Sequence, residues 1–150
     1  MAKGMSYKKA TDLSDLIEKR ERKKYELLRL PKKKDQMKKI HKILLKKYSD
    51  KISVWIVNGR LVRDLFFIDF TEGGHDKVYP FIPENEVWLD DDVAIRERKF
   101  ILLHELHERN LMSKGLVYEK AHRKASELEY FCRNNIKKLD KKIKEELSRK

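Results

Sequence analysis

The spacing of apolar residues changes from a helical to a strand period near residue 50. Before that point apolar side chains recur every three or four residues, which predicts one helix over residues 10–29 and a second over residues 33–48. Pro31 separates the two segments, as proline commonly does between helices. The first third of the chain is therefore predicted to form a helical hairpin with a narrow apolar stripe.

Strand-forming residues dominate the segment that follows. Residues 52–57 are almost all β-branched or aromatic, and Asn58-Gly59 is the dipeptide most typical of a two-residue hairpin turn. The segment from Arg60 to about Phe70, nearly all apolar from Leu65 onward, is then the expected partner strand. Further along, the sequence predicts a loop, an extended segment and a short strand, over residues 71–76, 77–85 and 86–90.

Two long helices are predicted to complete the chain. The three aspartates at 90–92 are suited to a helix N-terminus, where carboxylates are favoured, and a helical pattern runs from Val93 to Met112. A second pattern runs from about Leu116 to beyond Leu139. The order predicts an α+β fold with a helical extension over residues 1–50. Residues 51–150 form the main domain, with a sheet of three or four strands followed by two helices.

Positive charge is concentrated at the two ends of the chain. The whole protein has a net charge of +12, and residues 1–50 contain 17 Lys or Arg against 7 Asp or Glu. Such charge can neutralise phosphates, so one hypothesis is a basic nucleic-acid-binding module in which any metal is structural. Its candidate contacts are the clustered lysines of the predicted hairpin: Lys32, Lys33, Lys34, Lys38, Lys39, Lys46 and Lys47.

Composition also bears on where the protein is expected to act. No apolar run approaches the length of a transmembrane helix, and the first residues lack the apolar segment of a signal peptide. Cys132 is the single cysteine, so an intramolecular disulfide is excluded and a reducing compartment is favoured. We therefore expect a cytoplasmic protein that does not enter a membrane.

Four polar side chains share one half of the helix predicted over residues 93–112: His104, Glu105, His107 and Glu108. Apolar residues occupy the rest of this helix almost all round, and such a helix is normally buried. Burying carboxylates and imidazoles without partners is costly. A divalent cation would supply a common partner, so the pattern predicts a metal site.

The spacing of these residues identifies candidate ligands. His104 and Glu108 are four residues apart and stack on one helical face, so both can reach one ion. Glu105 can instead reach a coordinated water, as does the Glu of an H-E-x-x-H helix. The next helix carries His122 on its apolar stripe, which completes a set of two His and one Glu for zinc or another divalent transition metal. Glu129, two turns further on, is either a rival third ligand or a partner of the ligands.

Three more residues are candidates for contacts near the site. His75 follows two glycines and could stabilise an oxyanion, and Tyr118 could act as an acid. His107 could be a ligand, line the cleft or bond to a backbone carbonyl. The alternative for each of the three is an ordinary structural residue. Glu119 and His122 also form one Glu-x-x-His element of di-iron bundles. Those bundles need the element twice, and this chain has it once.

Residues 52–140 resemble a zincin metallopeptidase of the minimal, gluzincin-like type. The resemblance rests on a small sheet, the extended strand Val87 to Leu89, the segment His104-Glu105-Leu106-His107-Glu108 and a following helix with a further ligand. It implies that His104 binds zinc, that Glu105 activates water, and that the strand near Trp88 pairs with a peptide or protein substrate. Zincins have His at the position of Glu108, and gluzincins have Glu at that of His122. The expected function is a zinc-dependent hydrolase of the peptidase type, or an inactive descendant of one.

Overall fold

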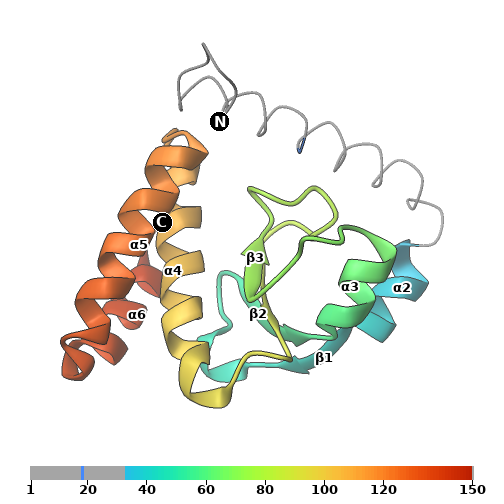
Figure 1. The fold of residues 1–150 in the computed structure, drawn as a ribbon, viewed down its shortest axis with the longest axis horizontal. Helices are drawn as coiled ribbons and strands as arrows, with labels where there is room; N and C mark the ends of the chain where they lie inside the picture. Colours follow the sequence, from blue (N-terminus) through green and yellow to red (C-terminus); the bar gives the residue numbers. More distant parts are fainter. Residues whose placement is uncertain (1–17, 19–32, 150) are drawn as a thin grey trace, which may run out of the picture.

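The computed structural model describes Glu18 and residues 33–149, which form an α+β fold (Figure 1). The helix predicted over residues 10–29 and Lys32 lie outside this part of the chain, apart from Glu18. The described part contains a four-stranded mixed sheet and five α-helices. In chain order the elements are α2 (Lys33–Ile40), β1 (His41–Leu44), η2 (Lys46–Tyr48), β2 (Ser53–Val57), α3 (Gly59–Leu65), β3 (Gly73–His75), β4 (Glu86–Asp90), α4 (Ile95–Ser113), α5 (Tyr118–Arg133), η3 (Ile136–Lys138) and α6 (Leu139–Ser148).

The strand order in the sheet is β1-β2-β4-β3. The central strands β2 and β4 are parallel, and each outer strand pairs antiparallel with its neighbour. Trp88 lies in β4, where Trp55 pairs with it on one side and Gly74 on the other. The prediction that the strand near Trp88 is a free edge was therefore wrong, because both of its edges are occupied. Within the described sheet, the edge strand that lies against α4 is β3.

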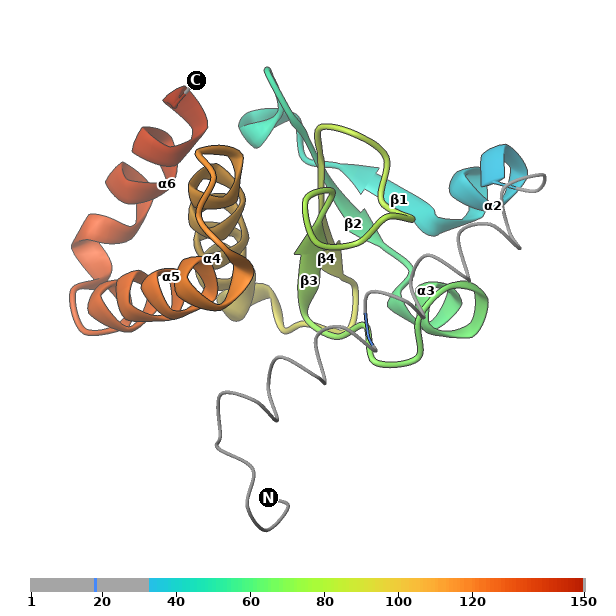
Figure 2. The same ribbon diagram turned by 90° about the horizontal axis from the view of Figure 1, so that it is seen from above.

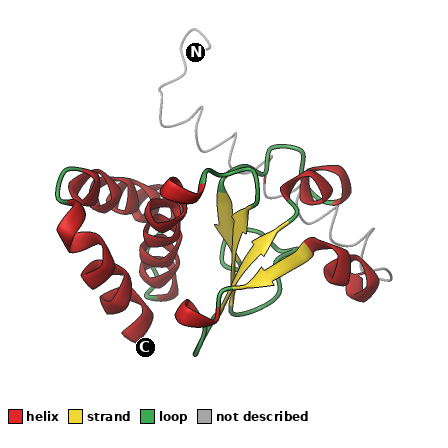
Figure 3. Ribbon diagram, turned by 90° about the horizontal axis from the view of Figure 1, so that it is seen from below, coloured by secondary structure: helices red, strands yellow, loops and turns green. Residues whose placement is uncertain are grey.

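Helices cover both faces of the sheet, which makes three layers (Figure 2, Figure 3). Successive residues of a strand point to opposite faces, so each central strand contributes to two cores. Val54, Ile56, Val87 and Leu89 pack with the buried residues of α4 and α6. Val57 and Trp88 pack on the other face with α2, α3 and the aromatic residues between α3 and β4. Because α4 is packed against both the sheet and α5, its polar residues become buried.

The predicted hairpin at Asn58-Gly59 and its partner strand over 60–70 were wrong, because residues Gly59–Leu65 form α3. Asn58 is the N-cap of this helix, and its side-chain oxygen accepts a hydrogen bond from the Leu61 amide at 3.1 Å. Val62 and Phe66, four residues apart, are both buried. Asparagine favours both turns and N-caps, and the parallel pairing of β2 with β4 requires a crossover instead of a hairpin.

The predicted helix over 33–48 was wrong beyond Ile40, because residues His41–Leu44 form β1. Pairing with β2 satisfies the backbone of this segment, and the His41 ring stacks on Trp55 with centroids 4.1 Å apart. This long-range pairing outweighs a local helical pattern. It also divides the exposed lysines, since Lys38 and Lys39 lie on α2, whereas Lys46 and Lys47 lie on η2 at the opposite end of β1 (Figure 2).

The last predicted helix is divided into α5 and α6, so the C-terminal part has three helices and not two. Asn134 and Asn135 lie at the break, and their side-chain amides donate to the carbonyls of Tyr130 and Phe131, four residues earlier. Asparagine side chains that bond to the backbone in this way compete with helix continuation. The turn allows Leu139 and Ile143 of α6 to pack back into the core beside α4. Among the described helices, none has the length and apolarity needed to cross a lipid bilayer.

Candidate metal centre

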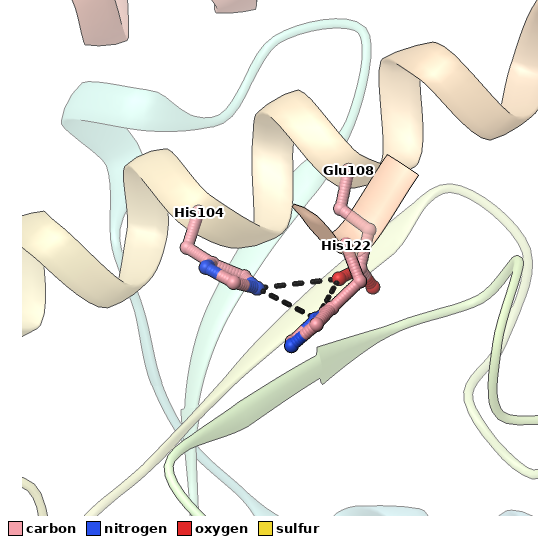
Figure 4. Close-up of side chains that lie close together, drawn as sticks. All are labelled: His104, Glu108 and His122. Atoms are coloured by element: carbon pink, nitrogen blue, oxygen red, sulfur yellow. Dashed lines mark hydrogen bonds and ion pairs between the residues drawn. The ribbon is translucent and has the colours of Figure 1, made fainter. Parts of the chain in front are cut away.

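Three side chains from two neighbouring helices converge on one point beside the sheet (Figure 4). His104 and Glu108 come from α4, and His122 comes from α5. His104 Nε2 lies 3.2 Å from both Glu108 Oε2 and His122 Nδ1, and His122 Nδ1 lies 2.8 Å from Glu108 Oε2. The three predicted ligands thus present one atom each to the same small space.

This triangle of atoms suits a small divalent cation. His104 Nε2 and His122 Nδ1 lie within hydrogen-bonding distance of each other and of the same oxygen, Glu108 Oε2, so three atoms able to bind a metal face one point. Zinc takes nitrogen and oxygen ligands at about 2.0–2.2 Å in tetrahedral geometry, which separates ligand atoms by about 3.3 Å. The observed separations of 2.8 to 3.2 Å need to widen only slightly to reach this value. The donor set of two imidazoles and one carboxylate is that of catalytic zinc sites.

Glu129 contacts the other side of the His104 ring and not the point of convergence. Its Oε1 lies 3.0 Å from His104 Nδ1, while its Oε2 accepts from Arg133 at 3.0 Å. Because a carboxylate only accepts, this contact places a proton on Nδ1 and leaves Nε2 for an ion. The hydrogen bond from His104 holds the pKa of Glu129 below its usual range, and the hydrogen bond from Arg133 adds to the effect. Glu129 thus contacts the far side of a candidate ligand, whereas His122 lies at the point of convergence.

Glu108 is the central acidic group of the cluster. Its side chain is only 4% exposed, and three histidines contact it: His104, His122 and His75. Burial by itself would raise the pKa of Glu108, but hydrogen bonds from these histidines outweigh it and lower the pKa well below the usual range. Burial would likewise lower the pKa of His104, but hydrogen bonds with Glu108 and Glu129 raise it to about 10. The metal-free cluster therefore keeps Glu108 ionised.

His75 reaches the cluster from the sheet. Its ring is fully buried on β3, and its Nε2 lies 2.9 Å from Glu108 Oε1, the oxygen that does not face His104. The neighbouring Asp76 forms an ion pair with Arg109, the residue after Glu108, at 2.6 Å. Two consecutive residues at the end of β3 are therefore joined to two consecutive residues of α4. This double connection fixes the sheet against the helix beside the candidate ligands.

Glu105 lies on α4 beside the three ligands, and it lines a cavity of about 230 Å³. Burial raises the pKa of its carboxyl group, and the charge of Glu108 raises it further. Gly73 of β3 lies close to both β4 and α4. A Cβ at Gly73 would lie 2.8 Å from the Trp88 carbonyl oxygen and 3.1 Å from Ile101 Cγ2, so a larger residue would force β3 to shift against these neighbours.

The cavity brings together candidates from three segments that are distant in sequence. Besides the cluster, Tyr118 lines it, and the Tyr118 ring lies 5.5 Å from that of His122. Burial and the charge of Glu108 raise the pKa of Tyr118, so its hydroxyl keeps its proton. The residues lining the cavity are Thr71, Glu72, Gly73, Val78, Tyr79, Ile101, His104, Glu105, Glu108, Tyr118, His122 and Glu129.

His107 does not join the cluster. Its Nδ1 lies 2.8 Å from Glu146 Oε1 on α6, and Asn110 donates to the other oxygen of Glu146 at 2.8 Å. The side chain of Glu146 is 3% exposed, so this contact is a buried link between α4 and α6. Of the residues predicted near the site, His75, Tyr118 and Glu129 reach the cluster or its cavity, whereas His107 faces another helix.

Several contributors were not identified from the sequence. Arg133, which orients Glu129, stands four residues after it, and this spacing was a usable signal. Thr71, Glu72 and Tyr79 come from segments predicted to be a loop and an extended stretch, and no local pattern marks them as cavity residues. Glu72 also has a backbone φ of 64°, an uncommon conformation for a residue other than glycine.

Comparison with known proteins identifies no relative of this chain. No protein-family model, no curated protein and no solved structure matches it.

Proposed function

We propose that this protein is a zinc-dependent hydrolase that cleaves an amide bond, with a peptide or protein as substrate. His104, Glu108 and His122 would hold the ion, and Glu105 would act as the base. The observation that carries the proposal is the convergence of His104 Nε2, Glu108 Oε2 and His122 Nδ1 within 3.2 Å of one another, beside a cavity lined by Glu105. The bound zinc would supply a Lewis acid that lowers the pKa of a coordinated water.

The remaining chemistry belongs to the side chains of the chain itself. The Glu105 carboxylate accepts a proton as water adds to the carbonyl carbon, and it then donates that proton to the leaving nitrogen as the C–N bond breaks. Burial raises the pKa of Glu105 above that of a free carboxyl group, and a more basic carboxylate is better suited to take up the proton. Tyr118 keeps its hydroxyl proton and lines the same cavity, so it can donate a hydrogen bond to the oxygen that gains charge.

A peptide substrate would approach the cavity beside β3, which is an edge strand of the described sheet and contributes Gly73 to the cavity lining. Gly73, Gly74 and His75 are buried, so an extended chain would pair with this edge only after the covering residues moved aside. β3 would then take the role that the sequence had suggested for the strand near Trp88.

The proposal is tested by zinc content and peptide hydrolysis in the same preparations. We expect about one zinc per chain in the parent, and loss of that zinc in His104→Ala and His122→Ala. Glu105→Gln should keep the zinc but lose turnover by about 10²–10⁴-fold, as expected for loss of a general base. The exposed Glu127→Gln on α5 is the matched control and should behave as the parent. A Glu105→Gln protein as active as the parent would exclude the proposed mechanism.

A further inference from the structure

The two hydrogen bonds of the His75 ring show whether His75 itself could bind a cation or instead donates to Glu108, a proposed ligand. Its Nδ1 accepts a hydrogen bond from the backbone N–H of Lys77 at 3.2 Å. A backbone N–H can only donate, so Nδ1 carries a lone pair and, in the neutral ring, the proton is on Nε2. The Nε2–H group therefore donates to Glu108 Oε1 at 2.9 Å.

Because of this hydrogen bond, the two oxygens of Glu108 have different partners. Oε1 is occupied by His75, and Oε2 faces His104 and His122. A carboxylate held in this way offers one oxygen to an ion and not two. A single oxygen, together with two imidazoles, leaves the fourth position of a tetrahedral ion open for water.

We infer that His75 is a positioning residue that restricts Glu108 to one-oxygen coordination and so sets four-coordinate geometry at the metal. The inference rests on the proposed metal site and adds a determinant of its geometry. The surroundings support a fixed position for His75, because its ring is fully buried and the adjacent Asp76–Arg109 ion pair holds the same strand to the same helix.

An alternative is a second cation bound by His75, Glu105 and Glu108. These residues do bring three possible ligand atoms within 4.8 Å of one another. The Lys77 hydrogen bond argues against it, because Nε2 could coordinate an ion only after losing its proton or after the ring gave up its contact with the Lys77 backbone. His75 Nε2 also lies 4.0 Å from Glu105 but only 2.9 Å from Glu108, as expected for a donor to Glu108.

Two amide substitutions separate the effect of losing the hydrogen bond from His75 to Glu108 from the effect of disturbing the fold. In His75→Gln the amide nitrogen can replace Nε2–H and still reach Glu108. In His75→Asn the shorter amide can accept from Lys77 but cannot reach Glu108. We expect zinc affinity about 10–100-fold weaker in His75→Asn than in the parent, the usual effect of losing a partner of a ligand. His75→Gln should remain close to the parent.

Cobalt substitution gives a readout that a merely structural role would not change. Four-coordinate Co²⁺ absorbs strongly in the visible range, whereas higher coordination absorbs weakly. The parent and His75→Gln should give strong bands, and His75→Asn should give weak ones. Unchanged bands and unchanged zinc affinity in a folded His75→Asn protein would overturn the inference while leaving the proposed function intact. A parent that binds neither metal would overturn both.

A measurement on the unsubstituted protein keeps the test independent of variant folding. Nitrogen-15 NMR of the imidazoles in the zinc-loaded parent should show His75 protonated at Nε2 and unprotonated at Nδ1. His104 should be protonated at Nδ1 and coordinated through Nε2. A His75 ring protonated at Nδ1, or coordinated to zinc through Nε2, would overturn the inference.

Discussion

The His104 ring meets Glu129 on one side and the candidate metal position on the other. Its Nδ1 lies 3.0 Å from Glu129 Oε1, and its Nε2 lies 3.2 Å from Glu108 Oε2. Glu129 in turn accepts from Arg133, which also bonds to Glu97 of α4 at 2.7 Å. A chain of charged groups thus runs from Glu97 through Arg133 and Glu129 to His104, and it turns Nε2 of the His104 ring toward the candidate metal position.

Removing Glu129 should weaken metal binding without abolishing it. Glu129→Ala takes away the acceptor for His104 Nδ1–H, so we expect zinc affinity to fall about 10–100-fold in a competition titration with a chelator. Glu129→Gln keeps an acceptor oxygen and should lose less. Glu127→Gln on the same helix is exposed and serves as the control. Complete loss of zinc from Glu129→Ala would show that Glu129 is itself a ligand.

Zinc binding should release a proton at neutral pH. In the metal-free protein the pKa of His104 is raised to about 10, so the ring is doubly protonated at any pH well below that value. Coordination through Nε2 requires that proton to leave, and so the apparent zinc affinity should increase with pH by about tenfold per unit below pH 10. Calorimetry in buffers of different ionisation enthalpy should report about one proton released per zinc. A binding heat that is the same in every buffer would contradict this.

The buried contact between Glu146 and His107 should make the C-terminal helix sensitive to acid. Burial would raise the pKa of Glu146, but hydrogen bonds from His107 and Asn110 lower it below its ordinary value of 4.5. A carboxyl group with a lowered folded-state pKa stabilises the fold above pH 4.5, and that contribution is lost as the pH falls through the folded-state value.

We therefore expect Glu146→Gln to lower the free energy of unfolding by about 2 kcal/mol at pH 7, as for a buried hydrogen bond to a charged group. The difference from the parent should shrink below pH 4.5, measured by urea denaturation in a chelator so that metal release does not contribute. Glu145→Gln, at a half-exposed neighbour that does not contact His107, is the control. A difference between parent and variant that is constant across this pH range would argue against the assignment.

Nucleic-acid binding through the basic N-terminal part stays a prediction of the sequence. If it occurs, affinity for duplex DNA should fall steeply with salt, and each lost phosphate contact should reduce the slope by about 0.9. Because Lys38–Lys39 and Lys46–Lys47 lie at opposite ends of β1, we expect the two double Lys→Gln variants to act separately and additively. The double variant Lys141→Gln/Lys144→Gln on α6 has the same charge change and serves as the control. No affinity at low salt in a fluorescence anisotropy assay would remove this hypothesis.

The sequence pattern correctly predicted features that depend on residues close together in the chain. The periodicity of residues 93–112 and the four-residue spacing of His104 and Glu108 predicted a buried helix with both side chains on one face, and α4 has that arrangement. That the two residues bind a metal stays a prediction. His122 and Glu129 were placed on the neighbouring helix for the same reason. The strand over 86–90 was likewise readable from neighbouring residues. The prediction that the three aspartates start the next helix was wrong, because α4 begins at Ile95 with Ala94 as its N-cap. The aspartate side chains instead form ion pairs with Arg63 and Lys42.

Tertiary structure decided the features that depend on distant partners. Asn58-Gly59 is compatible with a hairpin turn and with a helix start, and only the parallel pairing of β2 with β4 selects the helix. Residues 41–44 became a strand because β2 offered an unpaired edge. Packing turns Nδ1 of His104 toward Glu129 and Nε2 toward Glu108, which gives the two carboxylates different proposed roles. The hydrogen bond from the Lys77 backbone N–H in turn determines which nitrogen of His75 faces Glu108. A sequence lists the donors and acceptors, but their directions follow only once packing has fixed each ring against its neighbours.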